Sequence, residues 1–177
     1  PQFAIVGGTT KSGTTSLYHY LKSHPEVCVS SIKETRYFLD EEYPLYAKYR
    51  FTRDGLEKYM SFFNDPVQQK KIWLEVTPDY LYSAKTPEWI KKVLPESKLI
   101  FLLREPISRV MSWYRFALQD GLIRPETTPD DYVNRQLEGN APHSQSWLSV
   151  SQGRYADYLD RWFELFDFEN ILVIFFE

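Results

Sequence analysis

Short apolar segments alternate along the chain with longer amphipathic ones, and this alternation most restricts the possible fold. Five apolar segments read as buried strands, at 3–7, 27–30, 72–76, 98–103 and 171–175. The segments between them predict helices at 14–23, 55–63, 86–95, 106–119, 130–137 and 154–166. We expect loops at 33–54 and 139–153. The alternation favours an α/β fold, a three-layer sandwich in which helices flank both faces of a central parallel sheet.

The composition is that of one globular domain with a substantial core. The 177 residues are 43% hydrophobic and 17% aromatic, which excludes a disordered chain. The net charge is −3, so we expect no nucleic-acid partner, and any anion site must be local. Cys28 is the single cysteine, which excludes an internal disulfide and a zinc site built from thiolates. The apolar runs are too short to span a bilayer, and we expect no membrane segment.

The first predicted strand runs into a glycine-rich loop, GGTTKSGTTS. Gly8 and Gly13 have the spacing of a loop that cradles phosphates, but Thr14 stands where an ATP-binding loop carries lysine. The lysine comes earlier, at Lys11. Where a tight turn joins a strand to the start of a helix, several backbone N–H groups point toward one place. Thr14 or Thr15 can cap this helix. This P-loop-like segment predicts an anion site, with an ordinary strand–helix turn as the alternative.

The end of the fourth predicted strand argues against a metal-bound triphosphate. Nucleotide sites that hold magnesium usually use an aspartate at such a strand end, and here the residue is Arg104. Arg109 and Ser112 follow on one face of the next helix. Arginine offers a planar fork that suits phosphate, so we expect protein cations rather than a metal to neutralise the anion.

Three segments in order resemble the sulfotransferases that use 3′-phosphoadenosine-5′-phosphosulfate (PAPS). They are KSGTTSLYHYL (11–21), REPISRVMSWY (104–114) and GRYADYLDRWFELF (153–166), and together with the strands between them they span nearly the whole chain. The resemblance implies an enzyme that moves a sulfuryl group from PAPS to an acceptor hydroxyl, or less often an amine, by in-line displacement.

The resemblance also implies roles for particular residues. Lys11 matches the lysine that contacts the transferring group, and Arg104 and Ser112 match the pair that binds the 3′-phosphate. Tyr155 matches an aromatic residue near the nucleotide. The remaining residues implied in PAPS binding belong to the first loop: Ser12, Gly13, Thr14 and Thr15.

Sulfuryl transfer needs a base that takes the proton of the acceptor. The segment KETRYF (33–38) resembles the corresponding stretch of the bacterial and Golgi glycan-modifying branches, in which a glutamate is the base. The resemblance therefore implies that Glu34 is catalytic. The alternative for Glu34 is an ion pair with Lys33 or Arg36 on a solvated turn.

The segment LEVTPDYL (74–81) resembles another stretch that borders the active site of the family. It implies Glu75, Thr77 and Tyr80 as substrate-binding residues, with the simple end of a strand as the alternative. Heparan-modifying members commonly carry lysine where this chain has Val76, which argues against a heparan-type acceptor. A small molecule, a lipid, a polyketide-like chain and a glycan all remain compatible with the sequence.

Residues 1–177 are expected to form a single sulfotransferase domain. The family usually has a further basic loop that closes over the 3′-phosphate after the last strand, and we expect this chain to lack that loop. No signal segment is apparent, which favours the cytoplasm, with the Golgi lumen as the alternative for a trimmed domain. Two rival functions remain, a P-loop-type nucleoside or metabolite kinase and a non-catalytic nucleotide-binding module.

Overall fold

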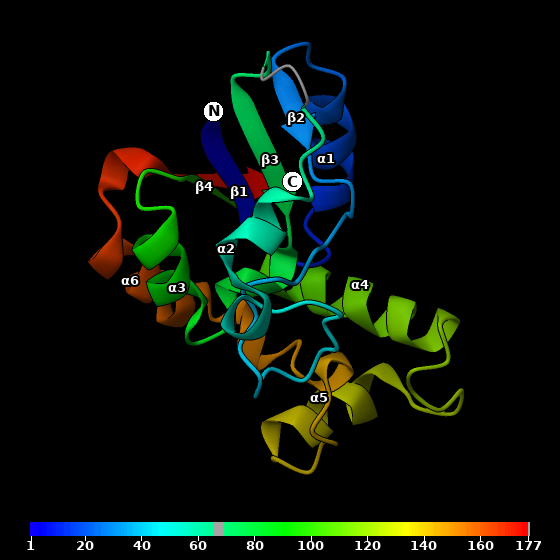
Figure 1. Cartoon of the computed structure of the whole chain (residues 1–177). Coiled ribbons are helices and arrows are strands. Elements are labelled where there is room, and N and C mark those ends of the chain that lie inside the picture. Colours follow the sequence, from blue (N-terminus) through cyan, green and yellow to red (C-terminus); the bar gives the residue numbers. More distant parts are fainter. Residues whose placement is uncertain (66–68, 177) are drawn as a thin grey trace.

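A computed structural model describes residues 1–65 and 69–176. Its centre is a five-stranded sheet in the order β2-β3-β1-β4-β5, and every neighbouring pair of strands is parallel (Figure 1). The strands are β1 (Gln2–Gly8), β2 (Val27–Val29), β3 (Ile72–Val76), β4 (Lys98–Arg104) and β5 (Ile171–Phe176). The α/β prediction and all five predicted strands are confirmed.

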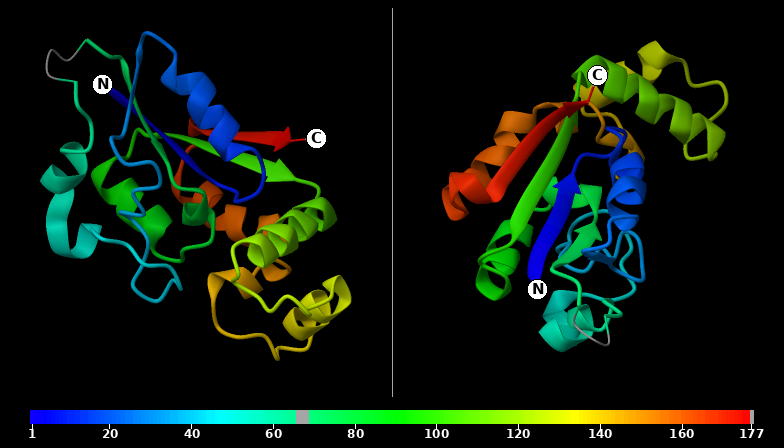
Figure 2. Two further views of the ribbon diagram at one scale, coloured as in Figure 1. Left: turned by 90° about the vertical axis from the view of Figure 1, so that its right-hand side faces the viewer. Right: turned by 90° about the horizontal axis from the view of Figure 1, so that it is seen from above.

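Six α-helices accompany the sheet in the described part of the chain. They are α1 (Thr14–Lys22), α2 (Phe51–Met60), α3 (Thr86–Val93), α4 (Pro106–Gln119), α5 (Pro129–Leu137) and α6 (Tyr155–Leu165). Viewed from above, α1 lies on one side of the sheet, and α3 and α6 lie on the other (Figure 2). The predicted three-layer arrangement is therefore confirmed.

Side chains that alternate along each strand form two separate cores. Ala4 and Val6 of β1 pack with Tyr18 of α1 on one face of the sheet. Ile5 belongs to the larger core on the other face, together with Phe101 of β4 and Trp162 of α6. Both faces of β1 are therefore buried, as expected of a central parallel strand.

Helices α4 and α5 extend beyond the carboxyl edge of the sheet, where they have a small core of their own around Tyr132 and Trp147 (Figure 1). The carboxyl ends of β1, β3 and β4 lie side by side, because β1 pairs with both neighbours. The loops that follow these strands therefore lie close together at this edge of the sheet.

The structure corrects three local predictions. Helix α2 begins at Phe51, earlier than predicted, and Gly55 interrupts it with a non-helical backbone. Gly13 occupies the N-cap of α1 and no side chain caps that helix, so the predicted threonine cap is wrong. The segment 139–153, predicted as a loop, contains two short 3-10 turns, Gln145–Trp147 and Ser151–Gly153.

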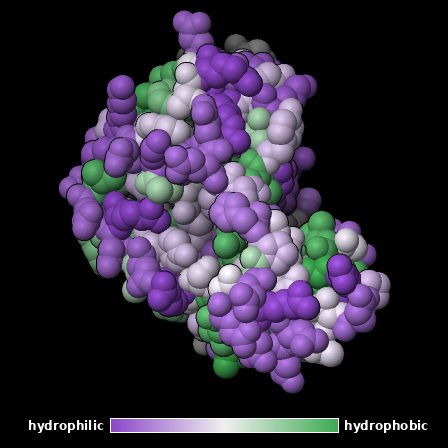
Figure 3. All heavy atoms as spheres, turned by 90° about the horizontal axis from the view of Figure 1, so that it is seen from below, coloured by the Kyte–Doolittle hydropathy of each residue, from purple (hydrophilic) through white to green (hydrophobic). Residues whose placement is uncertain are grey.

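Within the described residues, no helix has the length and apolar character needed to cross a membrane. The face of the molecule seen from below is largely hydrophilic, with hydrophobic residues in separate small patches (Figure 3).

Candidate active site

A cavity of about 250 Å³ lies at the carboxyl edge of the sheet. Lys11, Thr14 and Thr15 of the first loop line it, and Glu34 faces the same space. A larger cavity of about 660 Å³ lies beside α5, but the residues that line it include none of the predicted site residues. The smaller cavity is therefore the candidate active site, because it joins the two predicted catalytic residues.

The first loop turns sharply before it enters α1. Gly13 has a left-handed backbone with φ of 84°, and a Cβ atom there would come within 3.0 Å of the Phe176 ring. Glycine is the residue that tolerates both conditions. Lys11 also has a positive φ, of 66°. Among the described residues, no side chain accepts a hydrogen bond from the first N–H groups of α1, which lie at the edge of the cavity.

The ammonium group of Lys11 lies in the cavity, 4.4 Å from the centre of the Phe116 ring on α4. Partial burial lowers the pKa of Lys11; the charge of Asp120 opposes this shift, and that of Arg104 adds to it. Lys11 is therefore a cation that has lost part of its hydration, and an anion in the cavity would replace that lost interaction.

Arg104 reaches the same loop from the end of β4. Its Nη1 donates a hydrogen bond of 3.2 Å to the backbone carbonyl of Lys11. The hydroxyl of Tyr155 donates to the carbonyl of Arg104 over 2.8 Å. The structure thus brings Lys11, Arg104 and Tyr155 together, although they come from widely separated parts of the sequence.

Thr10 connects the loop to α4. Its Oγ1 accepts a hydrogen bond of 3.1 Å from the indole Nε1 of Trp113, and Nη1 of Arg109 lies 3.5 Å away. Arg109 is fully buried and also donates to the carbonyl of Ser149, so it holds the loops together rather than facing a ligand. Ser112 is half-buried on the same helix, and no hydrogen bond joins it to Arg104 in the described part of the chain.

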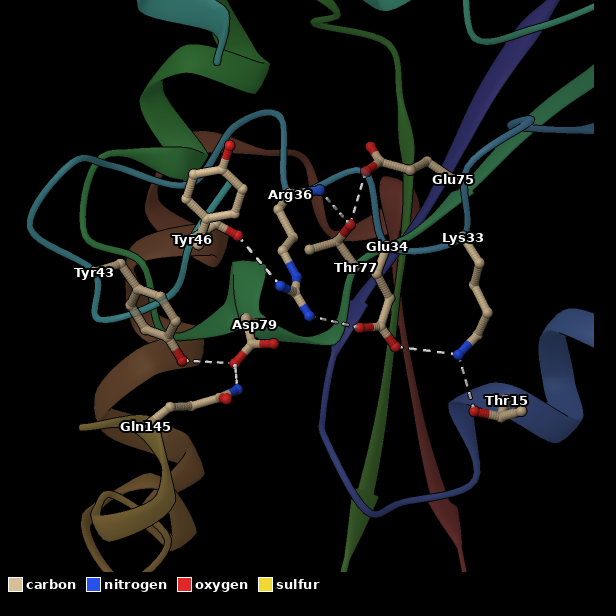
Figure 4. A network of polar contacts seen from close by, with 10 residues as sticks. All are labelled: Thr15, Lys33, Glu34, Arg36, Tyr43, Tyr46, Glu75, Thr77, Asp79 and Gln145. Carbon is tan, nitrogen blue, oxygen red and sulfur yellow. Dashed lines mark hydrogen bonds and ion pairs between the residues drawn. The ribbon is translucent and has the colours of Figure 1, made fainter. Parts of the chain in front are cut away.

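Glu34 follows β2 through a turn in which its own φ is 58°. Its N–H donates to the carbonyl of Val76 over 3.0 Å, which attaches the turn to the end of β3. Its carboxylate forms ion pairs with Lys33 at 3.1 Å and with Arg36 at 3.5 Å. Lys33 Nζ also donates to Thr15 Oγ1, 3.1 Å away (Figure 4). Glu34 therefore forms the expected ion pairs and also lines the cavity.

Glu75 lies behind the cavity in a closed cluster of hydroxyl groups. Its fully buried carboxylate accepts from Tyr59, Tyr80 and Thr77, each at 2.8 Å, and from Thr35. Burial raises the pKa of Glu75, and these four hydrogen bonds oppose that shift. The structure does not bring Glu75, Thr77 or Tyr80 into the cavity.

This cluster nevertheless supports the cavity wall. The hydroxyl of Thr35, the residue after Glu34, donates a hydrogen bond to Glu75. Thr77 Oγ1 accepts the backbone N–H of Arg36 over 3.2 Å (Figure 4). The buried carboxylate therefore holds both sides of the turn that carries Glu34.

Sequence reasoning missed several residues that line or border the cavity: Thr10, Lys33, Arg36, Asp79, Phe116 and Gln145. Lys33 and Arg36 flank Glu34, so the same motif could have identified them. Asp79 lies two residues after Thr77, just beyond the end of a predicted strand, and this position could have identified it as a residue of the site. Nothing in the local sequence of Gln145 points to this place, because tertiary packing alone brings it there.

Comparison with known proteins agrees with the geometry. The family model described as "Sulfotransferase domain" matches residues 1–177. The human heparan sulfate glucosamine 3-O-sulfotransferase 6 is 28% identical over 97% of this chain and 45% of its own length. The membrane-associated sulfotransferase kil1 of Dictyostelium discoideum is 34% identical over 77% of this chain and 27% of its own length. The chain thus spans less than half the length of these relatives.

A solved structure gives the same result. The crystal structure of a sulfotransferase from Alicyclobacillus acidocaldarius superposes with a TM-score of 0.84 at 27% identity, over 99% of this chain and 73% of that one. The family model covers residues 1–177 and the structural match covers 99% of this chain, and the protein belongs to the sulfotransferase domain family.

Proposed function

We propose that this chain transfers a sulfuryl group from PAPS to a hydroxyl group of an acceptor. One observation carries the proposal: Lys11 and Glu34 face one cavity, while Arg104 is hydrogen-bonded to the backbone of Lys11. A donor with two separate anionic groups needs cations near both, and an acceptor needs a base on the same side.

The residues at the loop fit such a donor. Ser12 Oγ is buried and has no hydrogen-bond partner among the described residues, so a polar atom remains available at the loop. Lys11, Gly13, Thr14 and Thr15 would hold the phosphosulfate together with the N–H groups of α1. Arg104 and Ser112 would hold the 3′-phosphate, with Tyr155 fixing the backbone of Arg104.

When bound, PAPS supplies the sulfuryl group, whose bond to the phosphate breaks as its bond to the acceptor oxygen forms in line. Lys11 stabilises the negative charge that develops on the phosphate side. Glu34 accepts the proton of the acceptor hydroxyl. Its two ion pairs hold the carboxylate in position while one face stays open to the cavity. Glu75, Thr77 and Tyr80 act as positioning residues behind it.

Calorimetric titration tests this proposal. The expected result is that adenosine 3′,5′-bisphosphate binds to the purified chain and that ATP with magnesium does not compete at equal concentration. Arg104 ends β4 where a magnesium-binding carboxylate would stand, so a chelator should leave the affinity unchanged. Tight, magnesium-dependent binding of ATP would instead favour the kinase alternative.

The Glu34→Gln variant distinguishes an enzyme from a binding module. If Glu34 is the base, this variant binds adenosine 3′,5′-bisphosphate normally but loses turnover with PAPS and an acceptor alcohol. Unchanged turnover in Glu34→Gln would contradict the role of Glu34.

A further inference from the structure

The cavity contains a second carboxylate, that of Asp79, which the proposed chemistry does not use. Asp79 lies on the 3-10 turn Pro78–Leu81 that follows β3. Its exposed fraction is 2%, and it lines the same cavity as Glu34. Burying a carboxylate is unfavourable unless its oxygens find partners, so this side chain requires an explanation.

Both hydrogen bonds of this carboxylate in the described part of the chain end on the same oxygen. The hydroxyl of Tyr43 donates to Oδ1 over 2.7 Å, and the amide of Gln145 donates to Oδ1 over 2.6 Å. Gln152 donates in turn to the Tyr43 hydroxyl over 3.0 Å, which fixes that ring. The donors hold the carboxylate in one orientation.

The second oxygen, Oδ2, has no hydrogen-bond partner among the described residues. Figure 4 shows it turned away from Tyr43 and Gln145, on the side where Glu34 and Arg36 lie in this view. Because Asp79 lines the cavity, this oxygen is available to a molecule that enters it. A rigid acceptor atom of this kind selects a ligand that carries a hydrogen-bond donor at the matching place.

The charge around Asp79 adds a second restriction. No described Lys, Arg or His nitrogen lies within ion-pair distance of its carboxylate. Burial raises the pKa of Asp79 and the charge of Glu34 adds to this, while Tyr43, Gln145 and Arg36 oppose it. Among the described residues, Glu34 is compensated by its two ion pairs, but Asp79 is not, so an anionic group placed against Oδ2 would be repelled, whereas a neutral hydrogen-bond donor fits there.

We propose that Asp79 determines acceptor specificity: its Oδ2 accepts a hydrogen bond from a second donor group of the acceptor, beside the hydroxyl that Glu34 deprotonates. This inference rests on the proposed function. The acceptor is accordingly an uncharged polyol, such as a sugar ring with neighbouring hydroxyl groups, rather than an acidic sugar or an isolated alcohol.

The Asp79→Asn variant tests Oδ2 with little change elsewhere. The amide oxygen of asparagine can still accept from Tyr43 and Gln145, and only the cavity-facing atom changes from an acceptor to a donor. Glu42→Gln is a matched control, because it makes the same charge change on an exposed residue of the neighbouring loop, outside this cavity. Circular dichroism and urea titration verify that both variants fold.

Three acceptor probes are compared with PAPS as donor: para-nitrophenyl glucoside, para-nitrophenyl glucuronide and para-nitrobenzyl alcohol. We expect the wild-type protein to favour the glucoside over both others in kcat/KM. In Asp79→Asn the KM for the glucoside should rise about tenfold, which is the loss expected for one hydrogen bond to a charged group, with little change in kcat. In the same variant, the ratio of kcat/KM for the glucoside to kcat/KM for the glucuronide should fall. The control Glu42→Gln should have the kcat and KM values of the wild type.

The possible failures are distinguishable. If the wild-type protein does not bind adenosine 3′,5′-bisphosphate, the proposed function itself is wrong and this inference fails with it. If the nucleotide binds but the glucoside is used no better than the other two probes, or Asp79→Asn keeps the wild-type KM values, only the role of Asp79 is overturned. If Asp79→Asn abolishes kcat with every probe, including the monohydric alcohol, Asp79 acts as the base and the specificity role is again overturned.

Discussion

At the scale of single residues, Lys11 carries the largest share of the proposed chemistry. Its ammonium group is partly buried over Phe116 and forms no ion pair within the described part of the chain. Its contact with the Phe116 ring is a weak one at a partly exposed site, and in the described part of the chain its ammonium group makes no hydrogen bond on which the fold depends. The same charge is well placed to stabilise the negative charge on the phosphate that leaves during sulfuryl transfer. A positioned cation of this kind stabilises mainly the transition state, in which that charge develops.

Lys11→Ala should therefore lower kcat with PAPS by about 100-fold or more, the range seen when one such stabilising group is removed. The free energy of unfolding, measured in urea, should change by less than about 0.5 kcal/mol, as for a substitution outside core contacts. Lys22→Ala, at the exposed end of α1, is the control and should change neither quantity. Turnover that survives in Lys11→Ala would remove this residue from the mechanism.

At the scale of elements, the first loop depends on its attachment to α4. Thr10 is the link, because its hydroxyl accepts from the Trp113 indole and lies near the Arg109 guanidinium. Both partners come from the buried face of α4. The loop therefore keeps its shape only if β1, the loop and α4 keep their relative positions.

Thr10→Val removes the hydroxyl but keeps the branched shape of the side chain. We expect adenosine 3′,5′-bisphosphate to bind at least about tenfold more weakly, because the loop loses its anchor and the Trp113 donor loses its acceptor. Thr10→Ser keeps the hydroxyl and should bind nearly as well as the wild type in the same calorimetric titration. Equal affinities for the valine and serine variants would show that this hydrogen bond does not shape the loop.

The bounds of a helix were predictable from the sequence where residues at its own ends determine them. Helix α4 has the predicted bounds, because Pro106 starts it and Gly121 follows its end. Helix α2 was predicted to begin at Gly55 but begins at Phe51, because glycine usually marks the end of a helix and here lies inside one. The surroundings of Glu75 were only partly predictable, since Thr77 and Tyr80 are close to it in the sequence, whereas Thr35 and Tyr59 come from distant segments and meet it only after folding.

At the scale of the whole molecule, the candidate site lies where the sheet meets the separate small core of α4 and α5. Lys11 follows β1, Arg104 ends β4, and α4 and α5 lie in a separate small core beyond the sheet. A nucleotide held at both of its anionic ends would add a bridge between these parts, and any ligand that binds only the folded state stabilises it.

Adenosine 3′,5′-bisphosphate at a hundred times its dissociation constant should therefore raise the free energy of unfolding by about 2.7 kcal/mol. The melting temperature should rise by several degrees, since about 1 kcal/mol shifts a domain of this size by roughly 2–4 °C. Added salt should reduce the gain, because the protein has a net charge of −3 and attracts the ligand only through local cations. Adenosine 5′-monophosphate, which lacks the 3′-phosphate, is the matched ligand, and at the same concentration it should stabilise the fold less. If both nucleotides gave the same rise, Arg104 and Ser112 would have no part in holding the second phosphate.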